Sequence, residues 1–124
     1  MKTFILSLAF VACVFVTGCT HTLPKPNNPQ TAGVEALVAY GLAGHVAGQY
    51  LALPLCTQPL TVVPCKTQAI ADKVKLADTA AYNAAVAADA AANGPNAAPL
   101  AQDAVTKIES LKAANAEAIK GSKP

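Results

Sequence analysis

The stretch from residue 66 to residue 93 constrains the fold most, because it is dominated by alanine. It contains 12 Ala and neither Gly nor Pro. Alanine has the highest intrinsic helix propensity of the amino acids. The stretch is followed by Gly94 and Pro95, which together are a common stop signal for a helix. We therefore predict one long helix over residues 66–93, with a seam that begins with branched side chains and becomes all alanine.

A second helix is predicted near the carboxyl end, over residues 97–120. Asn96 can cap its start, and Pro99 is tolerated in the first turn because the amides there lack partners within the helix. Residues at three- and four-residue spacing form its expected buried seam, and they are Ala101, Ala104, Ile108, Leu111, Asn115 and Ala118. The polar Asn115 on this seam can fix the register or the oligomeric state.

A third helix is predicted over residues 32–53, with Thr31 as its N-cap and Pro54 as its stop. Small residues and one tyrosine recur every four positions along one side, and they are Ala32, Ala36, Tyr40, Gly44, Gly48 and Ala52. Gly41, Gly44 and Gly48 each lower helix propensity by about 1 kcal/mol. We therefore expect another helix to approach closely at these three glycines.

These segments predict an all-α fold, with an Ala-rich helical hairpin and one apolar, Gly-containing helix in a domain over residues 32–121. Residues 122–124 are expected to form a loose tail. A core of Ala, Val and Leu buries little apolar area per residue. Close packing, a crosslink or a partner would then have to support the fold.

The first 19 residues carry the clearest functional signal. Lys2 precedes an apolar stretch, Phe4 to Val16, that is short for a membrane span. The stretch ends in Val16-Thr17-Gly18-Cys19, which resembles the lipobox of bacterial lipoproteins. The resemblance implies cleavage after residue 18, a diacylglycerol thioether on Cys19 and an N-acyl chain such as palmitate on the new amino terminus. An ordinary signal peptide or an N-terminal membrane anchor is the alternative.

Further expectations follow from the same resemblance. Residues 19–31 would be the lipidated cysteine and a Pro-rich tether. Thr20 is not the Asp that retains lipoproteins in the inner membrane of enterobacteria, so the resemblance implies the periplasmic leaflet of the outer membrane in a diderm cell. The Ala-rich helices after a lipobox also resemble small envelope lipoproteins of the Braun type. Pro124 stands where those proteins have a terminal Lys, so covalent attachment to the cell wall is not expected.

The remaining two cysteines, Cys56 and Cys65, flank a Pro-rich corner at residues 54–65. Cys13 lies in the leader and Cys19 would carry lipid. An even pair in an exported chain predicts a disulfide. A metal site with His45 or His21 is the alternative for the pair, although the spacing lacks the short Cys-x2–4-Cys knuckle of common zinc sites. The corner could also serve as a rigid recognition loop.

Charge and motifs exclude several functions. From Cys19 onward the chain has eight Lys, seven acidic residues and no Arg, so its side chains sum to +1 without a basic cluster. Nucleic-acid binding is therefore not expected. No catalytic, metalloprotease or phosphate-loop motif is present. We expect no enzymatic activity, no small-molecule substrate and no cofactor apart from the covalent lipid.

The sequence therefore predicts a lipid-anchored envelope protein with a structural or protein-interaction role, as a scaffold or accessory subunit. Its helices would contact a protein partner or a second copy. The alternative is a small membrane-perturbing lysis or toxin-type lipoprotein, of phage origin, that acts through residues 32–53. Gly44 and Gly48 match the small-xxx-small pattern of membrane helix pairs. Glu35, His45 and Gln49 interrupt the apolar surface, and an ionised Glu is costly to place in hydrocarbon.

Overall fold

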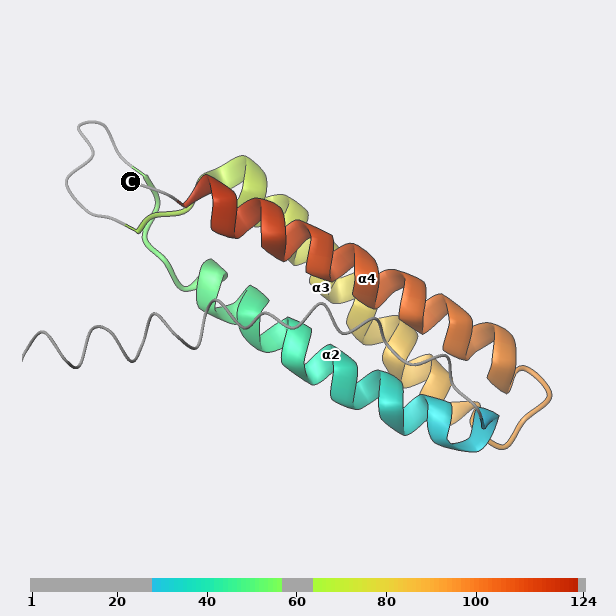
Figure 1. Cartoon of the computed structure of the whole chain (residues 1–124). Helices are drawn as coiled ribbons and strands as arrows, with labels where there is room; N and C mark the ends of the chain where they lie inside the picture. The colour runs from blue at the N-terminus through green and yellow to red at the C-terminus, as the bar shows by residue number, and fades with distance from the viewer. Residues whose placement is uncertain (1–27, 57–63, 123–124) are drawn as a thin grey trace, which may run out of the picture.

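The structure is a computed structural model that describes residues 28–56 and 64–122. It contains three α-helices, α2 (Pro29–Leu51), α3 (Gln68–Ala90) and α4 (Ala97–Gly121). Figure 1 shows a three-helix bundle in which α2 and α4 run in the same direction and α3 runs opposite to them. Each helix packs against the other two. The predicted all-α fold is confirmed.

The helix ends differ from the predicted ones by two or three residues at most positions. α2 begins with Pro29, which suits a first helical position because its missing N–H would have no partner there. Thr31 is therefore inside the first turn, where its hydroxyl donates a hydrogen bond to the Asn28 carbonyl at 3.1 Å. The prediction of Thr31 as the N-cap is wrong. Only residues 20–28 separate Cys19 from the helix, so the predicted tether is shorter by three residues.

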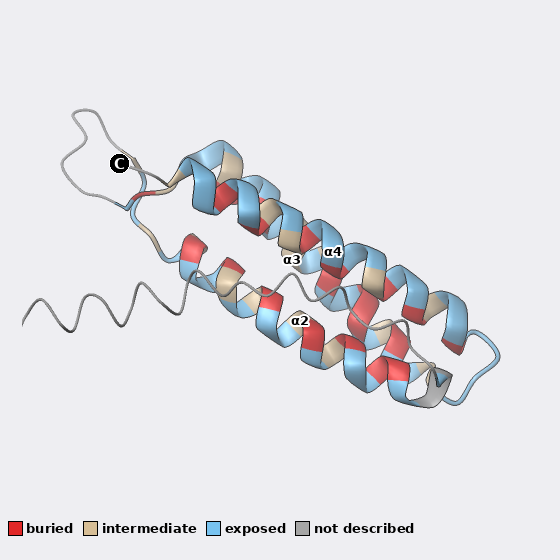
Figure 2. Ribbon diagram, in the orientation of Figure 1, coloured by how far each residue is buried: buried red, intermediate tan, exposed pale blue. Residues whose placement is uncertain are grey.

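The predicted seam of α4 is confirmed at every position. Buried residues of this helix are Ala97, Ala101, Ala104, Ile108, Leu111, Asn115 and Ala118. Figure 2 shows that the buried residues of all three helices lie on the sides that face one another. The largest fully buried side chains are Ile108, Leu111 and Val74, and most of the remaining core is alanine. The small core side chains let the helices approach closely.

α2 contacts its neighbours through residues other than the predicted glycines. Within the described chain, a Cβ added at Gly41 or Gly48 would meet no atom within 4 Å apart from the nearby backbone of α2 itself, and the atoms nearest to one added at Gly44 belong to Tyr40 of the same helix. The predicted helix approach at these glycines is wrong for the described chain. Residues four apart in an α-helix are rotated by about 400° around its axis, which is about 40° more than a full turn. A row of residues at this spacing that starts at the core therefore moves about 40° further from the core at each step.

The close approach occurs instead at Gly33, near the start of α2. A Cβ at this position would lie 2.5 Å from the Asp89 Cα and 2.9 Å from the Asp89 backbone nitrogen. Both atoms belong to the backbone of α3, which cannot move as a side chain does. A hydrogen atom in place of a side chain therefore lets α2 and α3 meet here.

Asn115 connects α4 to α2 inside the core. Its Nδ2 donates a hydrogen bond to the Ala43 carbonyl at 2.9 Å. Within the described ranges, the Asn115 Oδ1 and the Tyr50 hydroxyl are buried without a hydrogen-bond partner. A buried polar group favours the one arrangement that provides its partner. The Asn115 contact therefore selects the register of α4 against α2.

Candidate functional site

The predicted lipidation site lies outside the described residues. Val16, Thr17, Gly18 and Cys19 precede Asn28, the first residue that the structure describes. His21, one of the two histidines considered as metal ligands, is also outside this range. The structure therefore shows where the chain enters the bundle, at the amino-terminal end of α2, and the lipid site stays a prediction from sequence.

The predicted disulfide between Cys56 and Cys65 is present, with the two Cα atoms 5.0 Å apart. Backbone hydrogen bonds extend the crosslink, because the Cys56 amide donates to the Lys66 carbonyl at 2.9 Å and the Lys66 amide donates to the Pro54 carbonyl at 2.8 Å. The Lys66 ammonium also donates to the carbonyl of Leu51, the last residue of α2. A cation stabilises a helix at this end.

The disulfide thus joins the end of α2 to the start of α3, as predicted, and both thiols are consumed in it. With this bond formed, neither thiol is free to ligate a metal ion. In residues 28–56 and 64–122, no group of three or more His, Cys, Asp or Glu side chains is placed to hold a metal ion. The recognition-loop alternative falls largely on residues 57–63, which are outside the described ranges.

Removing this disulfide should destabilise the bundle moderately. The double variant Cys56→Ser/Cys65→Ser should lose about 2 kcal/mol of unfolding free energy, since a crosslink that closes a short loop restricts the unfolded chain. Urea denaturation followed by circular dichroism measures the difference. Dithiothreitol should destabilise the wild type similarly and leave the double variant unchanged. Equal midpoints for the reduced and oxidised wild type would contradict this role.

His45 and Gln49 lie one turn apart on the exposed side of α2, and their Nε2 atoms are 3.0 Å apart. Both residues interrupt the apolar surface of the helix, as the sequence predicted. No helix among the described residues is long and apolar enough to cross a membrane.

Tyr40, Asp78 and Tyr82 form a cluster where α2 meets α3, and the sequence did not predict this cluster. The Tyr40 hydroxyl donates a hydrogen bond to the Asp78 Oδ1 at 3.1 Å. The rings of Tyr40 and Tyr82 have centroids 5.4 Å apart and are tilted by 54°. Asp78 and Tyr82 are four residues apart and therefore share one side of α3. This spacing is the only feature of the sequence that brings two members of the cluster together. The cluster fixes the outer edge of the contact between α2 and α3.

Burial raises the pKa of Tyr40 above its ordinary value of 10.0, and the hydrogen bond to Asp78 and the charge of that carboxylate raise it further. The unfolded chain therefore loses the Tyr40 proton at a lower pH than the folded chain does. The corresponding contribution to stability is complete below about pH 10 and is lost as the pH rises through the folded pKa.

Tyr40→Phe should therefore make stability less sensitive to alkaline pH. Near pH 7 the variant should lose about 1 kcal/mol, because it lacks the hydrogen bond to Asp78. Between about pH 10 and 11 the gap to the wild type should narrow. Urea denaturation of both proteins at each pH measures the difference between their free energies of unfolding. The two proteins have the same lysines, so the effect of alkaline pH on these side chains is common to both and cancels in the difference. A gap that stays constant or widens would contradict the raised pKa.

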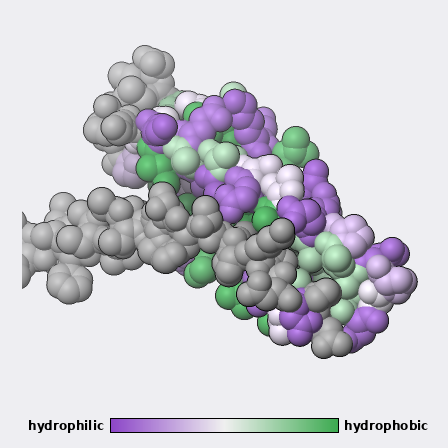
Figure 3. All heavy atoms as spheres, turned by 45° about the vertical axis from the view of Figure 1, so that its right-hand side comes forward, coloured by the Kyte–Doolittle hydropathy of each residue, from purple (hydrophilic) through white to green (hydrophobic). Residues whose placement is uncertain are grey.

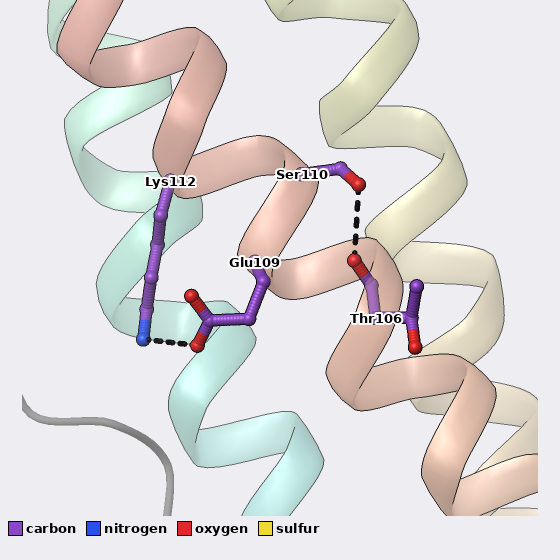
Figure 4. A network of polar contacts seen from close by, with 4 residues as sticks. All are labelled: Thr106, Glu109, Ser110 and Lys112. Atoms are coloured by element: carbon purple, nitrogen blue, oxygen red, sulfur yellow. Dashed lines mark hydrogen bonds and ion pairs between the residues drawn. The ribbon is translucent and has the colours of Figure 1, made fainter.

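Several polar side chains on the surface of α4 make contacts within the helix itself. Figure 4 shows the Ser110 hydroxyl turned to the Thr106 carbonyl, and an ion pair between Glu109 and Lys112 on another side of the helix. The donor–acceptor distances are 3.0 Å and 2.9 Å. A second ion pair, Lys73–Glu117, joins α3 to α4 at 2.9 Å. Exposed pairs such as these contribute little to stability.

The most distinctive surface of the bundle is the side of α2 that points away from α3 and α4. We call it the α2 outer face, and its exposed residues are Val34, Glu35, Val38, Gly41, Leu42, His45, Gly48 and Gln49. Its large apolar side chains are Val34, Val38 and Leu42, which are 57%, 63% and 73% exposed. They lie about one turn apart within the first four turns of the helix.

Comparison with known proteins found no matching family model, no matching curated protein and no matching solved structure.

Proposed function

We propose that the protein is a lipid-anchored scaffold or accessory subunit of a bacterial cell envelope. The observation that carries the proposal is Val16-Thr17-Gly18-Cys19 at the end of a short apolar leader with Lys2 before it. Cys19 would carry diacylglycerol and an N-acyl chain. In a diderm cell, Thr20 would direct the protein to the periplasmic leaflet of the outer membrane. No catalytic step is part of the proposal.

The bundle supports an interaction role through its exposed apolar side chains. Leu76 and Tyr82 on α3 and Ile119 on α4 are at least half exposed, and Val86 is 42% exposed. Single exposed apolar residues are common on proteins, but partner contacts in a tethered protein can be weak because tethering raises the effective concentration. A protein partner or a second copy would use these surfaces.

The membrane-perturbing alternative requires α2 to leave the bundle. Its inner side chains Ala36, Ala43 and Ala47 are buried, and the Ala43 carbonyl accepts the hydrogen bond from Asn115. Transfer of α2 into a bilayer would expose the core of α3 and α4 and leave Asn115 without this partner. These contacts favour the interaction role.

Photo-crosslinking in the native host tests the interaction role. A photoreactive amino acid at Leu76 or Ile119 should give a discrete adduct of defined mass. The same amino acid at the exposed polar residue Asp103 serves as the control for random collision. Only monomer at both apolar positions would contradict the interaction role. Leakage of a periplasmic dye on induction of the wild type would support the lysis alternative instead.

A further inference from the structure

We propose that the α2 outer face rests on the lipid surface of the membrane that holds the chain, with Val34, Val38 and Leu42 inserted among the lipids. This inference rests on the proposed lipid anchor. It assigns α2 to the membrane side of the bundle and leaves α3 and α4 free for a protein partner.

The geometry of α2 fits one-sided contact with a surface. Residues of the opposite side, such as Ala36, Ala43 and Ala47, are buried against the other helices. Val34, Val38 and Leu42 are four residues apart, so they form a row along the outside of the helix. Figure 3 shows a row of apolar residues along the lower edge of the molecule, where α2 lies. The helix can therefore lie along a membrane without any change in the bundle.

The anchor would enter the bundle at the correct end for this contact. Residues 20–28 span at most about 28 Å in an extended, polyproline-like form. They lead directly to the start of α2, and the three apolar side chains lie within its first four turns. The lipid on Cys19 would hold this end of the helix near the bilayer. Under such a tether, even a weak apolar contact is populated for most of the time.

The size of the face favours a lipid surface over a second copy of the chain. α2 has 23 residues. At 1.5 Å per residue it is about 35 Å long, and one side about 10 Å wide presents roughly 350 Å². A stable protein–protein interface needs about 800 Å² on each partner. The face is too small for a stable dimer but is sufficient for a protein already attached to the membrane.

Charge defines the kind of lipid contact. Glu35 is the only Asp, Glu, Lys or Arg in α2, so this helix offers no cation to an anionic headgroup. Surface-bound helices that rely on anionic lipids carry Lys and Arg on their polar side. Contact through the α2 outer face would therefore depend on apolar insertion. It should occur on zwitterionic membranes and should be insensitive to salt.

Two tryptophan variants provide a matched test. The chain has no Trp, so one introduced indole reports on one site. Leu42 and Leu76 are equally exposed, at 73% and 75%, but lie on α2 and α3. The chain from Cys19 onward contains every described contact, and with Cys56 and Cys65 bonded its one free thiol is Cys19. Coupling that thiol to a maleimide lipid in phosphatidylcholine vesicles supplies the anchor chemically.

With brominated phosphatidylcholine in the vesicles, the Leu42→Trp protein should show a blue-shifted emission and at least about twofold stronger quenching than the Leu76→Trp protein, at low and high salt. Adding Val38→Asp to Leu42→Trp should remove the difference. Equal quenching of both proteins, or no quenching of either, would overturn the proposal. A blue shift that grows with protein density without bromine quenching would indicate a second copy on the face and would also overturn it.

These outcomes are independent of lipidation in cells, because the coupling replaces it. An unlipidated Cys19 in the native host would refute the proposed function and leave the vesicle result unchanged. Conversely, lipidation of Cys19 in the host together with an unquenched Leu42→Trp protein on the vesicles would refute only the placement of α2 on the membrane.

Discussion

Ile108→Ala should lower the free energy of unfolding by about 2–5 kcal/mol, among the largest effects expected of a single truncation in this bundle. Ile108 is completely buried, and most of the core around it is alanine. Alanine side chains are too short to fill the space that three missing carbons leave. The cavity should therefore persist, and the loss should be near the upper end of the range. Urea denaturation followed by circular dichroism at 222 nm measures it.

Ile119→Ala is the matched control for this prediction. Ile119 belongs to the same helix but is 54% exposed. Because the surface variant leaves no cavity, its loss should be within about 0.5 kcal/mol. Similar losses for both variants would mean that α4 does not present its predicted seam to the core.

Gly33→Ala should destabilise the protein by about 3 kcal/mol, since a methyl group there would overlap the backbone of α3. The added Cβ would lie 2.5 Å from the Asp89 Cα, so α2 and α3 must separate to admit it. Separation would weaken the alanine contacts along the whole length of both helices. Thermal unfolding of the variant should show a lower midpoint at unchanged helix content.

Gly41→Ala is the control and should have the opposite sign. Apart from the nearby backbone of α2, no atom of the residues that the structure describes lies within 4 Å of a Cβ at Gly41. Alanine at an exposed helix position should therefore stabilise the protein by about 0.5–1 kcal/mol through its higher helix propensity. Destabilisation by Gly41→Ala in the isolated protein would show that this glycine contacts another helix after all, as the sequence had suggested.

Local sequence signals were sufficient to predict the three helices and the buried side of α4. Pro54, Gly94 and Pro95 separate the segments, and the buried positions of α4 follow the regular spacing of Ile108, Leu111 and their neighbours. The disulfide could also be predicted, because Cys56 and Cys65 are the two cysteines left after the leader and the lipid site are assigned.

The orientation of α2 could not be predicted from its own sequence. Small residues occur on both sides of this helix, so periodicity does not distinguish the side with Ala36 and Ala43 from the side with Gly41 and Gly48. The choice depends on contacts with α3 and α4, such as the Asn115 hydrogen bond to Ala43. The hydrogen bond between Tyr40 and Asp78 spans 38 residues and has no local signature either.

The site differs from the fold in this respect. The proposed processing signal, Val16-Thr17-Gly18-Cys19, is a pattern of consecutive residues, so proposing it required no tertiary structure. The structure adds the start of α2 at Pro29, which leaves residues 20–28 between Cys19 and the bundle.

The mass of the amino-terminal peptide tests the central proposal most directly. The protein is to be extracted from membranes of the native host, digested and analysed by mass spectrometry. We expect a peptide that begins at Cys19 and carries diacylglycerol on the thiol. This peptide should be absent from Cys19→Ala, in which the leader should stay uncleaved. A peptide that begins elsewhere, or a Cys19 without lipid, would contradict the account.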